Sequence, residues 1–160
     1  MTTPGSSSHG AGTPAFESLM AQVMAVAERF GHREHVHLTW LAVRRHGIPG
    51  AIDLISDGIQ RTARYAGVPQ KYNATVTRAW TELIGHHASE TPEEDFARFA
   101  DHHPALLDKR LLTRFYHSAT LAGPHAKQSW VPPDLAPFPW QDSGGQETGR
   151  SWTRYDARES

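Results

Sequence analysis

Apolar residues recur at spacings of three and four positions along most of this chain, and this period constrains the fold more than any other feature. Phe16, Leu19, Met20 and Val23 show it near the amino end. Such spacing places apolar side chains on one face of an α-helix. No stretch alternates apolar and polar residues for long enough to predict a strand. The sequence therefore predicts an all-α fold.

Proline, glycine and capping residues divide the pattern into a compact bundle of five to six short helices. Gly47 is expected to end one helix, and Pro49 suits the first turn of the next. Thr91 and Glu94 form a predicted capping box. A short helix is allowed at 118–130, before an extended proline-rich strap at 131–139. The predicted helices cover about 14–30, 32–46, 49–66, 70–87, 91–102 and 106–116.

Polar segments flank the helical region at both ends. They are rich in Gly, Ser, Thr and charge and contain almost no aliphatic residues. Such segments cannot bury enough apolar surface to offset the entropy lost on ordering. We therefore expect a single helical domain at 14–139, between disordered tails at 1–13 and 140–160. Trp152 and Tyr155 are exceptional in the second tail, where they suggest a weak docking segment.

Composition excludes several classes of function. The chain has 160 residues, a net charge of -1 and scattered arginines, so it lacks the basic surface that nucleic acids or anionic membranes require. With no cysteine, it can form neither a disulfide nor a thiolate metal site. We expect neither a membrane span, since no apolar run is long enough, nor a secretory signal. A cytoplasmic location is expected, and the oligomeric state is left open.

Histidine is unusually frequent, with 11 residues. Projection of helix 32–46 at about 100° per residue places His32 and His35 within an apolar arc, together with Thr39 and His46. A buried polar group without a hydrogen bond costs about 1–3 kcal/mol, so these groups need partners. His32 and His35 are therefore the first candidates for a functional site. The opposite arc is predicted to face solvent and contains Arg33, Glu34, His37, Arg44 and Arg45, with Leu41 out of place.

Two further polar residues are predicted to point inward. Asn73 projects with the apolar face of helix 70–87 and lies near its start. Asp108 projects into the apolar arc of helix 106–116, where it either caps the helix or orients an inward histidine. Four histidines lie at predicted helix ends, namely His86, His87, His102 and His103. A protonated histidine interacts favourably with the carbonyl end of a helix, so most of these four are interpreted as structural.

Several short motifs resemble those of a family of small bacterial proteins. The resemblance covers roughly 30–139 and implies an all-helical fold, but it implies no particular activity. Family members carry a histidine after the Lys-Tyr pair, where this chain has Asn73, so a histidine-rich site would have lost one ligand here. The motifs are Phe30-x-His32-x-x-His35 with Trp40, Lys71-Tyr72-x-x-Thr75, Leu106-Leu107-Asp108-Lys109 with Phe115-Tyr116, and Val131-x-Pro133-Asp134-Leu135.

Two functional hypotheses follow from these residues. The first is a small bacterial enzyme acting on a small metabolite, by metal-free acid/base chemistry or with Fe(II) or Zn held by His32 and His35. The second is a non-catalytic module that binds a small molecule or a partner protein. The predicted catalytic residues are His32, His35, Asn73 and Asp108, and the predicted substrate-binding residues are Thr39, Trp40, Tyr72, Trp80 and Tyr116.

Overall fold

A computed structural model describes residues 4–144, and it contains no strand in that range. The predicted all-α fold is confirmed. Within the described range no helix is both long and apolar enough to cross a membrane. Trp152 and Tyr155, in the predicted second tail, lie outside the described residues. The helices are α1 (Pro4–Met24), α2 (His32–Tyr65), α3 (Ala74–Glu90), α4 (Phe96–His102), α5 (Ser118–Ala122), α6 (Pro124–Gln128) and α7 (Pro139–Gly144), with the 3-10 helices η1 (Pro69–Lys71), η2 (Pro104–Leu107) and η3 (Leu111–Arg114).

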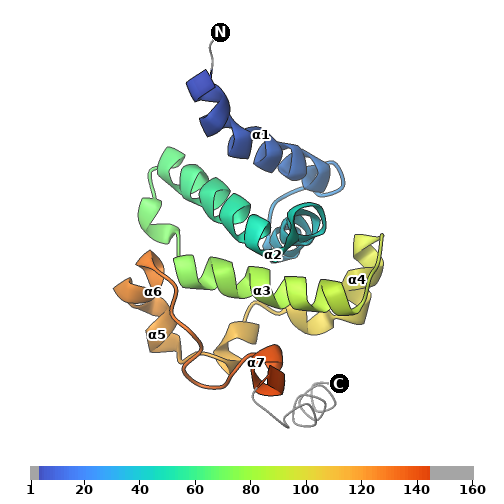
Figure 1. Cartoon of the computed structure of the whole chain (residues 1–160), viewed down its shortest axis with the longest axis vertical. Coiled ribbons are helices and arrows are strands. Elements are labelled where there is room, and N and C mark those ends of the chain that lie inside the picture. The colour runs from blue at the N-terminus through green and yellow to red at the C-terminus, as the bar shows by residue number, and fades with distance from the viewer. Residues whose placement is uncertain (1–3, 145–160) are drawn as a thin grey trace.

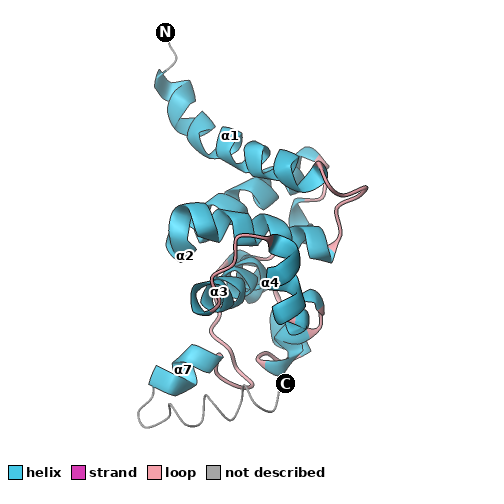
Figure 2. Ribbon diagram, turned by 90° about the vertical axis from the view of Figure 1, so that its right-hand side faces the viewer, coloured by secondary structure: helices cyan, strands magenta, loops and turns pink. Residues whose placement is uncertain are grey.

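Helix α2 lies in the middle of a layered arrangement. In Figure 1, α1 lies above α2, α3 lies below it, α5 and α7 lie below α3, and α6 lies beside the start of α3. Figure 2 shows the same order of α1, α2, α3 and α7 from the side. Since α2 is covered on both sides, it buries side chains in two directions.

Two apolar clusters occupy these two sides of α2. The first joins α1 to α2 and contains the buried side chains Leu19, Val23, Leu38, Ala42, Ala51, Leu54 and Ile55. The second joins α2 to α3, α4 and the C-terminal segments. Its largest buried members are Trp40, Trp80, Phe96, Phe99, Phe115, Tyr116 and Phe138. Burial of both clusters away from water is the main force that holds the helices together.

A break at Gly47 divides α2 into two arms. Gly47 has φ 76° and ψ 172°, a positive φ that glycine adopts without the steric cost of a Cβ. Pro49 follows and cannot donate a backbone hydrogen bond. The predicted end of one helix at Gly47 and start of another at Pro49 are thus confirmed as the two arms of α2.

The other predicted boundaries shift, and one predicted helix does not form. Helix α1 begins at Pro4 and ends at Met24, earlier than expected at both ends. Helix α3 continues to Glu90 and uses Thr91 as its C-cap, so Thr91 is not available to cap the next helix. Asp95 caps α4 instead, by accepting a hydrogen bond from the Ala97 backbone. The predicted capping box is therefore wrong.

The predicted helix 106–116 is also wrong, because the short 3-10 turns η2 and η3 replace it. Asp108 leaves the helical conformation, with φ -96° and ψ 110°. Its carboxylate accepts a hydrogen bond from the Arg110 backbone at 2.9 Å, a local bond that competes with helix formation. The two turns still bury Leu106, Leu111 and Leu112.

Gly85 permits α3 to lie close to α2. A Cβ at this position would come within 2.4 Å of the Ile48 side chain. We expect Gly85→Ala to lower the free energy of unfolding by about 1–2 kcal/mol, because overpacking outweighs the better helix propensity of alanine. Gly123→Ala is the control, since a Cβ there meets its nearest atoms at 3.5 Å. Urea denaturation of both variants measures the difference, and equal stabilities would contradict the close approach.

Candidate functional site

His32 lies at the first position of α2, with its ring against the indole of Trp80. The two ring centroids are 4.7 Å apart. The Nε2 atom of His32 lies 2.9 Å from the carbonyl oxygen of Leu106. Because a carbonyl oxygen only accepts hydrogen bonds, Nε2 carries the proton and donates it here. This bond ties the start of α2 to η2.

His35 follows one turn later and is half-buried, with its ring edge toward Phe30 at 6.3 Å between centroids. Burial, and then the neighbouring charge of His32, lower the pKa of His35 to about 4. The imidazole is therefore neutral at pH 7. It could accept a proton, but a base with so low a pKa is a weak one at neutral pH.

Asn73 caps the start of α3. Its Oδ1 accepts a hydrogen bond from the Val76 backbone at 2.9 Å, and its Nδ2 donates one to the carbonyl of Leu121 at 2.8 Å. Asn73 precedes Trp80 by two helical turns, about 10 Å along the axis. Neither of these hydrogen bonds goes to His32, and together they give the amide a local role between α3 and α5.

Asp108 is exposed, so its predicted inward orientation is wrong. Its carboxylate accepts hydrogen bonds from the backbone and guanidinium of Arg110. Those bonds lower the pKa of Asp108. The prediction failed because the helical projection assumed an α-helix where the chain forms two separate turns. Asp108 orients no histidine in this structure.

The predicted substrate-binding residues are divided between the cores and a cleft. Thr39 is buried, and its hydroxyl donates to the carbonyl of His35 at 2.9 Å. Tyr116 is fully buried and donates its hydroxyl to the carbonyl of Val131 at 2.7 Å, while burial raises its pKa. Tyr72 is half-buried and follows η1 directly. Of the predicted set, only Trp40 lines a cleft described below.

The structure does not support the predicted metal site. Within the part of the chain that it describes, no three His, Asp or Glu side chains are grouped so that they could hold a metal ion. His32 and His35 thus have no third ligand among the described residues. His46, which the projection placed in the inward arc, is exposed.

Three adjoining clefts lie over one face of α2. Their volumes are about 580, 330 and 470 Å³, and Trp40 and Glu94 line all three. We call them together the Trp40 trough. Its α2 wall contains Arg33, Glu34, His37, Trp40, Leu41, Arg44 and Arg45, and its other walls contain Val26 and Ala27 before α2, Ala88 of α3, and Pro92, Glu93, Glu94, Asp95, Phe96, Ala97 and Arg98 around the start of α4.

Aromatic rings and guanidinium groups form the floor of the Trp40 trough. The guanidinium of Arg44 lies 4.6 Å from the Trp40 ring centroid and donates to the carbonyl of Glu93 at 2.8 Å. His37 stacks on Phe96, with ring centroids 4.2 Å apart and planes 5° apart. Burial, and then the charge of Arg33, lower the pKa of His37. The floor therefore presents cationic groups that pack on aromatic rings.

Comparisons with known proteins do not identify a relative. No family model, no curated protein and no solved structure matches this chain. The candidate site is therefore assigned from geometry alone.

The sequence did contain a signal for the Trp40 trough. The α2 residues that line it are largely those predicted to face solvent, and Leu41 was the apolar residue out of place among them. Leu41 is half-buried because it packs on both apolar clusters. An apolar residue within a charged helix face is typical of a face that is partly covered. The covering segment, around Glu94, is distant in sequence.

Proposed function

We propose that this protein is a non-catalytic binding module whose Trp40 trough holds an extended polypeptide segment of a partner protein. The observation that carries the proposal is the continuity of the three clefts, which share Trp40 and Glu94. Arg44 and Arg98 are exposed in the trough, and Arg is among the residue types that most often dominate the energy of protein interfaces.

The length of the trough supports a polypeptide ligand. On α2 it extends from Arg33 to Arg45, which is about 18 Å at 1.5 Å per residue. An extended chain rises about 3.3 Å per residue, so five or six residues span this length. Sites for small metabolites are usually concave, mostly apolar pockets that bury most of the ligand. The trough is longer and carries more charge than such a pocket.

Charge in the trough indicates the chemistry of the ligand. Arg98 and Glu94 are exposed, and neither forms an ion pair within the described residues. Val26, which is 78% exposed, adds an apolar edge at the other end. Because opposite charges face the same groove, the matching segment carries both acidic and basic side chains. It also carries an apolar side chain that contacts Val26.

The acid/base enzyme predicted from the sequence has less support from the geometry. Neither His32 nor His35 lines any of the three clefts of the trough. His32 uses Nε2 to bind the Leu106 carbonyl. The low pKa of His35 makes its imidazole neutral, and a neutral imidazole can accept a proton. This observation supports the enzyme hypothesis as a second proposal.

Selection from a library of random linear peptides tests the binding proposal. Peptides enriched on the wild-type protein are synthesised with a fluorophore and titrated by fluorescence anisotropy. We expect the Kd to rise about tenfold or more in Arg98→Glu and in Glu94→Lys, because each change places a like charge against the ligand. Peptides of reversed charge should regain affinity for these variants.

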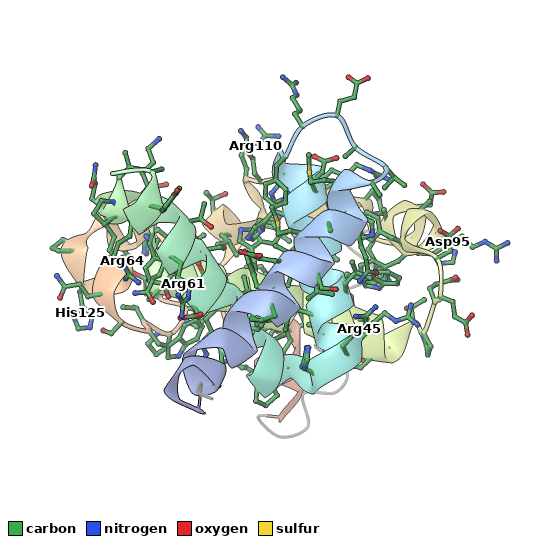
Figure 3. All side chains as sticks on the ribbon, turned by 90° about the horizontal axis from the view of Figure 1, so that it is seen from above. Arg45, Arg61, Arg64, Asp95, Arg110 and His125 are labelled. Carbon is green, nitrogen blue, oxygen red and sulfur yellow. The ribbon has the colours of Figure 1, made fainter. Side chains whose placement is uncertain are left out.

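Arg64→Glu is the matched control. Arg64 is exposed near the end of α2, and Figure 3 shows it at the opposite end of the molecule from Arg45 and Asp95, which line the trough. This variant should bind the selected peptides as tightly as the wild type. The proposal is overturned if no selected peptide distinguishes the wild type from the two trough variants.

A further inference from the structure

Two stretches of the chain that are distant in sequence contain basic side chains but no Asp or Glu. They are residues 58–81 and residues 118–133, and we call them together the basic end. Their basic residues are Arg61, Arg64, Lys71, Arg78, His125 and Lys127. The chain has 17 acidic residues, all of them elsewhere, so the basic end differs from a whole sequence whose net charge is only -1.

The fold brings these two stretches side by side. The side-chain amide of Asn73, before α3, donates a hydrogen bond to the carbonyl of Leu121 in α5 at 2.8 Å. Figure 1 shows α6 beside the start of α3. Figure 3 shows Arg61, Arg64 and His125 at the same end of the molecule. Cations that are scattered along the sequence are therefore gathered at one end of the folded chain.

The acidic residues next to these stretches in sequence already have basic partners. The pairs are Asp57 with Arg61 at 2.8 Å, Glu82 with Arg78 at 2.7 Å, and Asp134 with His117 at 3.5 Å. In contrast, Arg64, Lys71 and Lys127 form no ion pair among the described residues. Asp53 precedes Arg64 by about 16 Å along α2. These three cations are therefore available to an anionic ligand.

Aromatic rings lie among the cations of the basic end. Tyr65 follows Arg64 directly and is 96% exposed. The guanidinium of Arg78 lies 4.2 Å from the ring centroid of Trp130, which is half-buried. Within 58–81 and 118–133, all of which the structure describes, Tyr65 is the only large apolar side chain that is exposed. Binding to a lipid surface scales with buried apolar area, whereas one exposed ring is enough to stack on a nucleic-acid base.

We propose that the basic end binds single-stranded nucleic acid. Arg64, Lys71 and Lys127 contact phosphate groups, and the ring of Tyr65 stacks on a base. A single strand fits this surface because its unstacked bases are free to meet an exposed ring. The expectation against nucleic acid followed from the net charge and from the spread of the arginines along the sequence, and neither shows where the fold places them. This inference does not rest on the function proposed for the Trp40 trough.

Fluorescence anisotropy tests the proposal, with a labelled single-stranded oligonucleotide of mixed sequence and about 12 nucleotides as the probe. We expect a Kd on the order of 10 µM at about 20 mM salt. The Kd should rise with salt, because each phosphate contact releases counterions from the strand. For three contacts, the slope of log Kd against log salt concentration should be about 2.

Variants of exposed residues separate the contributions of charge and stacking. Arg64→Glu and Lys71→Glu should each weaken binding about tenfold or more and lower the salt slope by about 0.7 or more. Tyr65→Ser should weaken binding about fivefold, whereas Tyr65→Phe keeps the ring and should bind like the wild type. Arg98→Glu is the matched control for net charge, because Arg98 lines the trough together with Asp95, at the other end of the molecule in Figure 3. It should bind the oligonucleotide as tightly as the wild type.

Three outcomes would overturn the proposal. The first is the absence of saturable binding up to about 200 µM protein at about 20 mM salt. The second is an equal loss of affinity in Arg64→Glu and Arg98→Glu, since this would reflect net charge alone. The third is binding of phosphatidylserine vesicles without binding of the oligonucleotide, which would assign the basic end to a lipid surface. None of these outcomes affects the peptide-binding proposal, for which Arg64→Glu is the control and Arg98→Glu the test variant.

Discussion

Lowering the pH from about 6.5 to about 4 should reduce the free energy of unfolding by about 6 kcal/mol in total. Burial lowers the pKa of His35 to about 4 and that of His87 to about 3, from 6.5 in both cases. The unfolded chain therefore binds protons that the folded chain does not, so stability present above pH 6.5 is lost as the pH falls. Each histidine contributes about 1.4 kcal/mol per pH unit in this range. The sum is comparable to the whole stability of a typical domain.

Urea denaturation at a series of pH values measures the slope of the free energy of unfolding against pH. His35→Gln and His87→Gln should each remove about half of it, because glutamine does not titrate. The slope is the diagnostic quantity, since either substitution also alters stability at neutral pH. His125→Gln should leave the slope unchanged, because His125 is exposed. A wild-type stability that is constant between about pH 6.5 and about pH 5 would contradict the burial of both imidazoles.

Replacing Phe138 by alanine should lower the free energy of unfolding by about 3–5 kcal/mol, the usual cost of deleting a buried aromatic ring. Phe138 is fully buried at the end of the proline-rich strap. Its ring contacts those of Phe115 at 5.1 Å, Tyr116 at 6.2 Å and Trp140 at 4.8 Å. It therefore joins the strap, η3 and α7 in one packed group.

Leu135→Ala is the matched control for Phe138, since it removes a large apolar side chain from the same strap. Leu135 is 51% exposed, so we expect a loss of about 0.5 kcal/mol or less. Thermal and urea denaturation of the two variants give the comparison. Similar losses in both would show that the strap is not anchored through the Phe138 ring.

The sequence predicted well where a residue's environment depends on its own helix. The break at Gly47 follows from a positive φ and a nearby proline, both local properties. Burial of Val36, Leu38 and Trp40 follows from helical spacing within α2. The same projection placed His32 and His35 in the inward arc, and both side chains are half-buried.

Prediction failed where a second segment decides the environment. The helical projection of residues 70–87 places Thr81 on the outer face, but Thr81 is fully buried, with its hydroxyl donating to the carbonyl of Thr77. Helix α3 is covered on more than one side, because α2 lies above it and the C-terminal segments below (Figure 1). Spacing within one helix identifies its most apolar face, but it does not show how many neighbours the helix has.

The sequence alone determined that this protein is helical, where its longest helix breaks, and that two histidines near the start of α2 turn inward. These features depend on local backbone preferences and on apolar spacing, which act over a few residues. Only the tertiary structure decided that Asp108 faces solvent, that His87 and His103 touch, and that charges distant in sequence meet over Trp40. Those outcomes depend on which segments pack together, and packing is set by the burial of the whole chain.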